Sequence, residues 1–306
     1  MQPLAAWLVA RPLNGGLGLI TALVLPMLSG VTSGLGPVIG GMVMAHLVFA
    51  NGIRLALFQG VAAAIFLGAF ALISNAEAMQ VVVTASIIWL PAAASAGLTV
   101  YLRSLTLALQ VTVILAMVGV LGFFVVLGDP IVFWNDVLMQ WTTLVRAGGQ
   151  SEYADQLLAS RALIIPQMTM MAVFTVWTWI VLVLLLGYGL FQSLPGKQAL
   201  FGRFCDLNFG RVLAAVMALT SVLALASGAA WLQNLAFVVF VVFWLQGLAV
   251  MHWLHAGKRL PLFVLLTTYA FLLVPVLNGL IVIALAILGY LDAWFNFRAR
   301  RTATAA

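Results

Sequence analysis

The sequence predicts an all-α fold, a polytopic transmembrane helical bundle of about ten membrane segments. Hydrophobic residues make up 65% of the chain and charged residues 7%, whereas soluble domains carry about 25% charged residues. Long runs contain no charged residue at all, as in residues 260–291. Basic residues stand singly or in small groups at the ends of these runs, where the loops of a multi-pass membrane protein lie.

The composition also limits the kinds of molecule that the chain is expected to bind. The net charge is +6, but the basic residues are scattered at the ends of apolar runs and do not form a patch. The charge therefore does not indicate a nucleic-acid partner. The only cysteine, Cys205, excludes an intrachain disulfide and a cysteine-based metal cluster. The expected partner is therefore the lipid bilayer, and no cofactor is predicted.

The lengths of the uncharged runs predict the spans, because a bilayer core of about 30 Å needs roughly 20 helical residues. Runs near this length predict one crossing each: 54–77, 77–103, 103–129 and 161–197. Two longer runs, 11–54 and 211–258, have turn-like centres at 29–34 and 227–234, and each predicts a hairpin of two spans.

The last run, 260–291, is too long for one span, and Pro275, Asn278 and Gly279 offer a break near its middle. Two crossings put every basic residue except Arg146 and Arg161 on one side. The positive-inside rule then predicts a multi-pass membrane protein with both termini cytoplasmic. The first two and last two segments are the ones expected to be short or re-entrant.

We expect a single integral membrane domain, 1–306, with an external amphipathic helical insertion at 129–161. Asp129 and Pro130 form a helix start, and a glycine pair at 148–149 forms a helix end. Between them an apolar face recurs at helical spacing: Trp134, Val137, Leu138, Trp141, Leu144 and Val145. This pattern indicates an interfacial helix anchored by tryptophans, with a lid over an outward-facing cavity as the alternative.

No catalytic motif appears, so the chain is not expected to be an enzyme. His252 and His255 are three residues apart but lack a third ligand, which favours interfacial histidines over a metal site. His46 is the histidine expected at membrane depth. Either it bonds to a neighbouring helix or it contacts a ligand.

Three further polar residues stand within apolar segments of the C-terminal half. Asn234 and Gln246 mark either a helix junction or a pocket, because buried amides need partners. We hypothesise that His46, Asn234 and Gln246 border a common ligand-binding cavity. Asp292 needs a cationic partner and is expected to form a structural ion pair with Arg211 or Arg298.

Four C-terminal motifs carry a resemblance to a known family. They are LNFGRV at 207–212, Asn234 opening a segment, LQGLAV at 245–250 and GYLDAWFNFR at 289–298. The chain thereby resembles the YybS-like predicted bacterial membrane proteins, a family of unknown function. That family is distantly similar to the substrate-binding S components of energy-coupling-factor transporters and to MreD-type cell-shape proteins. The resemblance implies an inner-membrane helical bundle but no known substrate.

Two classes of function follow. The first is a small-molecule or lipid-binding, transport-related component that lacks its own energising domain. The second is an envelope assembly or cell-shape scaffold whose cytoplasmic turns dock another membrane protein. The outer amphipathic insertion and the glycine-rich, proline-broken N-terminal segments slightly favour the first class.

Overall fold

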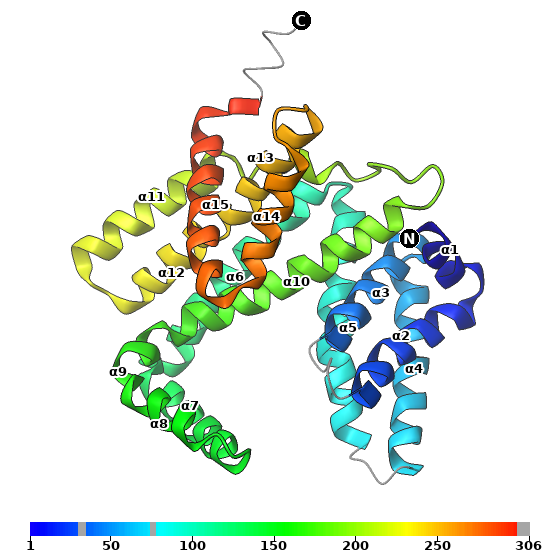
Figure 1. Cartoon of the computed structure of the whole chain (residues 1–306), viewed down its shortest axis with the longest axis horizontal. Helices are drawn as coiled ribbons and strands as arrows, with labels where there is room; N and C mark the ends of the chain where they lie inside the picture. The colour runs from blue at the N-terminus through cyan, green and yellow to red at the C-terminus, as the bar shows by residue number, and fades with distance from the viewer. Residues whose placement is uncertain (30–34, 74–77, 299–306) are drawn as a thin grey trace, which may run out of the picture. The chain divides into compact units, whose positions relative to one another are not determined.

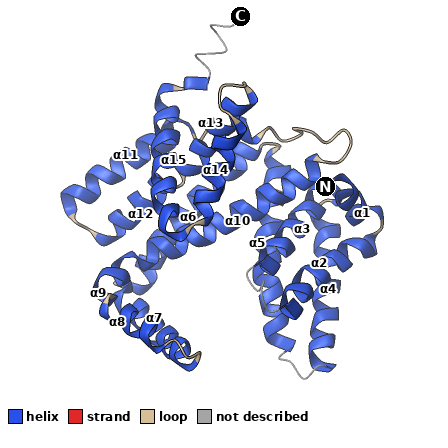
Figure 2. Cartoon of the chain, viewed as in Figure 1, coloured by secondary structure: helices blue, strands red, loops and turns tan. Residues whose placement is uncertain are grey.

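Every regular element that the structure describes is a helix, as a computed structural model of the chain shows (Figures 1 and 2). The described residues are 1–29, 35–73 and 78–298. Residues 30–34 of the turn predicted at 29–34 and the basic residues Arg300 and Arg301 lie outside them. The all-α prediction is therefore confirmed for the described part of the chain.

The helices fall into two compact units, which are described separately below. Unit 1 comprises residues 1–109 and 178–203, and unit 2 comprises residues 110–177 and 204–306. Unit 1 contains α1 (Gln2–Ala10), α2 (Pro12–Ser29), α3 (Leu35–Asn51), α4 (Ile53–Ile73) and α5 (Ala78–Leu102). Helices α6 (Leu105–Leu127) and α10 (Met168–Gln192) contribute residues to both units.

Unit 2 contains the remaining elements. They are α7 (Pro130–Ala147), α8 (Ser151–Ala159), α9 (Arg161–Ile164), η1 (Ile165–Gln167), η2 (Phe204–Asp206), α11 (Gly210–Ser227), α12 (Ala230–Val241), α13 (Phe243–Ala256), α14 (Leu262–Leu273) and α15 (Pro275–Phe295).

The apolar helices are those of a multi-pass membrane protein. Within the described residues, seven helices are long and apolar enough to cross a bilayer, or up to eight if the bent pair α1–α2 counts as one span. Helices α3 and α14 are apolar but shorter. The expected count of about ten segments is therefore not confirmed, because helical segments exist in the expected places but not all have spanning length.

The final apolar run is divided in two. Helix α14 ends at Leu273 and α15 begins at Pro275, so the break falls where proline and the residue before it disfavour a continuous helix. The Asn278 amide donates to the Leu272 carbonyl at 2.5 Å and satisfies one of the acceptors that the break leaves free. With 12 residues, α14 is about 18 Å long and too short to span the hydrocarbon core.

The N-terminal helices of unit 1 are held in a bend of 118°. Three side-chain amide or imidazole groups reach carbonyls near this bend. Asn14 donates to Trp7 O at 2.6 Å, Gln59 donates to Pro12 O at 2.7 Å, and His46 Nε2 lies 3.2 Å from Ala5 O. Gln59 and His46 are buried, and their contacts satisfy carbonyls that would have no water to bind in lipid.

A second anchor of unit 1 is an aromatic cluster beside the loop that follows α10. Phe49 of α3 lies 5.3 Å from Tyr188, 5.6 Å from Phe191 and 5.7 Å from Phe201, measured between ring centroids. The Tyr188 hydroxyl donates to Gly202 O and accepts from Phe201 N, which fixes the loop on the helix. Such ring pairs add to the burial of their apolar area.

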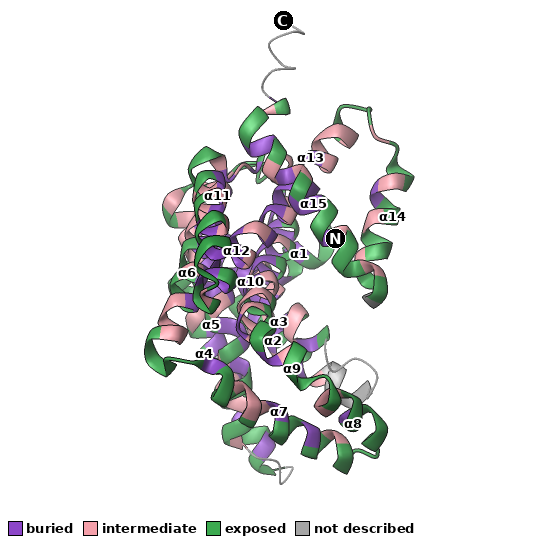
Figure 3. Ribbon diagram, turned by 90° about the vertical axis from the view of Figure 1, so that its left-hand side faces the viewer, coloured by how far each residue is buried: buried purple, intermediate pink, exposed green. Residues whose placement is uncertain are grey.

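The core of unit 2 is the crossing of α13 and α15, which are largely buried on their facing sides (Figure 3). Glycine makes this close approach possible. A Cβ at Gly247 would overlap the Leu285 carbonyl, and a Cβ at Gly289 would overlap the Phe243 carbonyl and lie 2.6 Å from Gly247 N. The two backbones therefore touch directly, as small residues allow in membrane helix pairs.

The glycine crossing predicts a sharp difference between three substitutions. Gly247→Ala and Gly289→Ala should each destabilise the protein by about 3 kcal/mol or more, because the new methyl group meets backbone atoms that cannot rotate away. Gly279→Ala in α15 is the matched control, since its Cβ would meet no atom within 4 Å. Thermal unfolding in detergent measures the effect. Equal melting temperatures for all three variants would contradict the tight crossing.

Candidate functional site: a buried polar network in unit 2

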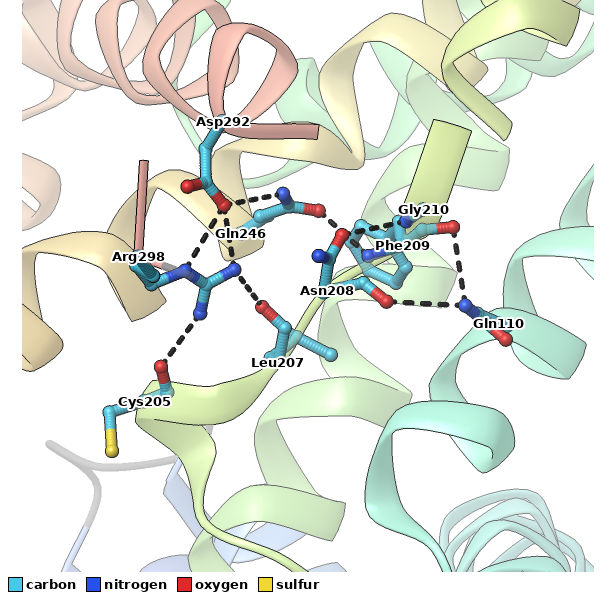
Figure 4. A network of polar contacts seen from close by, with 9 residues as sticks. All are labelled: Gln110, Cys205, Leu207, Asn208, Phe209, Gly210, Gln246, Asp292 and Arg298. Carbon is cyan, nitrogen blue, oxygen red and sulfur yellow. Dashed lines mark hydrogen bonds and ion pairs between the residues drawn. The ribbon is translucent and has the colours of Figure 1, made fainter. Parts of the chain in front are cut away.

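A buried ion pair lies at the carboxyl end of α15. Asn296 adopts a left-handed conformation (φ 50°), and its amide donates to Asp292 O at 2.8 Å. This turn, which asparagine tolerates better than most residues, brings Arg298 back against the helix. Arg298 Nη2 and Nε then lie 2.6 Å and 3.1 Å from Asp292 Oδ2 (Figure 4). The side chains are only 9% and 0% exposed, so the pair is shielded from solvent.

The guanidinium group of Arg298 also holds a segment far away in sequence. Its Nη1 donates to Cys205 O and its Nη2 to Leu207 O, each at 2.7 Å. Both carbonyls belong to residues 204–209, which we call the connector and which lead into α11. The planar fork of an arginine suits this double role, because its five N–H groups can reach a carboxylate and backbone carbonyls together.

Two glutamines complete the network. Gln246 of α13 donates from Nε2 to Asp292 Oδ2 at 2.9 Å, and its Oε1 accepts from Phe209 N at 2.7 Å. Gln110 of α6 donates to the carbonyls of Asn208 and Phe209, both at 3.2 Å. Side chains from α6, α13 and the end of α15 thus satisfy the polar backbone of the connector (Figure 4).

The network is almost fully satisfied. Asp292 Oδ2 accepts three hydrogen bonds, whereas Oδ1 is buried without a hydrogen-bond partner. Breaking a buried ion pair leaves an uncompensated charge, but replacing the whole pair by apolar groups is often neutral. The benefit of this pair therefore lies less in stability than in fixing one conformation of the connector.

The structure distinguishes between the two arginines that were expected as alternative partners of Asp292. It places Arg298 against Asp292, while Arg211 is exposed at the start of α11 and forms no ion pair with Asp292. The sequence could not decide between the two arginines, because the position of Arg298 depends on the left-handed turn at Asn296. Of the two expected alternatives, the pair of Asp292 with Arg298 is formed and the pair with Arg211 is not.

The three residues assigned to a common cavity have separate surroundings. His46 belongs to unit 1, where it reaches Ala5 O, and its Nδ1 has no hydrogen-bond partner. Asn234 belongs to unit 2 and donates to Ala230 O on its own helix at 2.9 Å. Gln246 serves the connector network. The hypothesis of a shared ligand site gains no support from these contacts.

One cavity is formed by α3, α4 and α5 within unit 1. Its volume is about 70 Å³, and its lining is apolar apart from Ser86, whose hydroxyl donates to Val82 O. The lining residues are Met44, Leu57, Gly60, Val61, Ala64, Ser86, Trp89 and Leu90. None of the three residues assigned to a common site contributes to this cavity.

Sequence reasoning missed Gln110 and Gln59. Each is an amide within an uncharged run, the same signal that singled out Gln246. It also missed the backbone of the connector as a partner, because main-chain acceptors leave no mark on the sequence.

No cluster of three or more histidine, cysteine, aspartate or glutamate side chains suited to a metal ion occurs among the described residues. Comparisons with protein-family models, curated proteins and solved structures find no match. The geometry of the polar network is therefore the main guide to function.

The buried ion pair predicts a large effect of Asp292→Ala. Removing the carboxylate leaves Arg298 buried and uncompensated, which typically costs about 3–5 kcal/mol. The melting temperature in detergent should fall, together with the abundance of the protein in membranes.

The matched control is Asp155→Ala. It breaks the ion pair between Arg146 and Asp155, whose side chains are 47% and 67% exposed, and solvent-exposed pairs contribute about 1 kcal/mol or less. A melting temperature that is equally lowered, or equally unchanged, in both variants would show that burial of the Asp292 pair has no special importance.

Proposed function

We propose that this multi-pass membrane protein is an envelope assembly or scaffold component of the bacterial inner membrane, which presents its ordered connector to a partner protein. The observation that carries the proposal is the buried Asp292–Arg298 pair, because Arg298 holds the connector at both Cys205 and Leu207. A docking surface needs one defined conformation, and buried polar groups can supply such specificity.

The surroundings of the connector support this function. The Phe204 ring lies 5.3 Å from the His252 ring, which places the connector beside the end of α13. Lys258 and Arg259 follow that end and are exposed, as is Arg211 after the connector. Exposed basic residues therefore stand beside the connector and after it, and these residues suit a partner with an acidic segment.

Photo-crosslinking in native membranes tests the scaffold proposal. A benzophenone amino acid at Arg211 should form an adduct with a protein, because Arg211 lies at the exposed edge of the connector. The same probe at Leu219 is the control, since this residue is 60% exposed on the apolar part of α11 and should react with lipid. A stoichiometric small molecule that co-purifies with the protein, without a protein adduct at position 211, would contradict the proposal.

The second candidate is a small-molecule or lipid-binding, transport-related component. The apolar cavity of unit 1 favours it, since Gly60 and Ala64 leave space opposite Trp89 and Leu90 where an acyl chain can lie. The resemblance to YybS-like proteins is compatible with either candidate and stays a prediction.

Filling the cavity of unit 1 with a larger side chain tests the lipid-binding candidate. Ala64→Leu should remove a lipid that otherwise stays bound to the purified protein in native mass spectrometry, because the larger side chain occupies the cavity. Ala62→Leu is the control, as Ala62 is exposed on the same helix and does not line the cavity. Identical lipid retention in both variants would count against lipid binding at this position.

A further inference from the structure

Helices α7 and α8 form a hairpin with its own local determinants. The Asp129 carboxylate accepts from Ile131 N at 3.0 Å and caps α7. At the other end, Gly149 has a φ of 82°, which favours glycine, and its amide donates to Arg146 O. Arg146 and Asp155 then join the two helices near the turn.

The base of the hairpin is fastened to the neighbouring helices α6 and α10. The Phe123 ring of α6 lies 5.3 Å from Phe133 and 5.5 Å from Trp134 of α7. The Trp134 indole also donates to the Thr169 hydroxyl of α10 at 2.7 Å. Because α6 and the helical segment 161–192 are both long and apolar enough to span a bilayer, these contacts join the hairpin to the ends of two candidate spans.

Helix α7 has three different sides. Leu138 and Thr142 are buried within unit 2, and Asp136, Gln140 and Thr143 form an exposed polar side. A third, apolar side consists of Phe133, Val137, Trp141 and Leu144, spaced by four, four and three residues. We call these four residues the apolar stripe.

Among the described residues, most of the apolar stripe is left exposed, although Phe133 packs edge to face against Phe123 on one side. Phe133, Trp141 and Leu144 are 40%, 46% and 70% exposed. The Trp141 ring meets the Tyr153 ring of α8 edge to face at 6.5 Å, which extends the stripe onto the second helix. A patch of this kind in contact with water is unfavourable, so another apolar phase should cover it.

Two observations favour lipid as that phase. Only Gly128 and Asp129 separate α6 from α7, and Val125 and Val126 at the end of α6 are more than 80% exposed, so the stripe continues a lipid-facing surface. Tryptophan and tyrosine are also the residues that prefer the boundary between headgroups and acyl chains.

We propose that the α7–α8 hairpin lies in the plane of the membrane and inserts its apolar stripe into the interfacial region of one leaflet. The polar side with Asp136, Gln140 and Thr143 faces water. The hairpin carries the acidic residues Asp136, Glu152 and Asp155 beside Arg146, so insertion depends on apolar burial and not on attraction to anionic lipids.

Spin-label accessibility tests this orientation. Single cysteines replace Leu144 or Thr143 in a Cys205→Ser background, and the full-length protein is reconstituted into phosphatidylcholine vesicles. A nitroxide at position 144 should be relaxed more by oxygen than by a water-soluble nickel complex, at a depth of about 5–10 Å into the leaflet. The neighbouring position 143 should show the opposite preference.

Two outcomes would overturn the proposal. Equal access of the nickel complex to positions 143 and 144 would show that the stripe lies in water. Protection of position 144 from both reagents would show that a protein surface covers it, either a second copy or another chain. Adding anionic phosphatidylglycerol should leave the depth at position 144 unchanged, and deeper insertion there would contradict the apolar origin of binding.

Discussion

The arrangement of unit 2 depends on one buried ion pair. Asp292 and Arg298 are close in sequence, but their shared hydrogen bonds reach α13 through Gln246 and the connector through Cys205 and Leu207. Two charges in an apolar surrounding are stable only if each is paired and hydrogen-bonded. The pair therefore requires that the end of α15, the first turn of α13 and the connector keep one relative position.

The glycine crossing and the ion pair support one another. Gly289 lies one turn before Asp292 on α15, and Gly247 is adjacent to Gln246 on α13. The direct backbone contact at the glycines brings these polar side chains within hydrogen-bonding distance, which larger residues would prevent. Burial of the polar groups in turn keeps the two helices in register, because any slip would leave a charge without its partner. A rigid crossing of this kind is a suitable base for an ordered connector, which the proposed docking function requires.

The sequence predicted the helical class, a break in the last apolar run near Pro275, and the start and end of α7 from local rules of charge, proline and capping. It could not predict the number of spans, because α3 and α14 have the composition of spanning helices without the length.

The polar network could be predicted only in part from the sequence. Lone amides and Asp292 could be recognised, but the partner of Asp292 depends on the backbone conformation at Asn296, and connector carbonyls have no sequence signal. His46 and Asn234 were assigned to one site because both are isolated polar groups, yet each meets a nearby helical carbonyl.

Hydrogen exchange of the connector amides tests most directly whether the network orders this segment. The Phe209 amide, which donates to Gln246 Oε1, should exchange slowly in the unaltered protein. In Gln246→Met it should exchange roughly tenfold faster or more, because a buried hydrogen bond of about 1–3 kcal/mol is lost. Amides of the α7–α8 hairpin should be unaffected. Equal exchange of the connector amides in both proteins would contradict the claim that the polar network holds the connector in place.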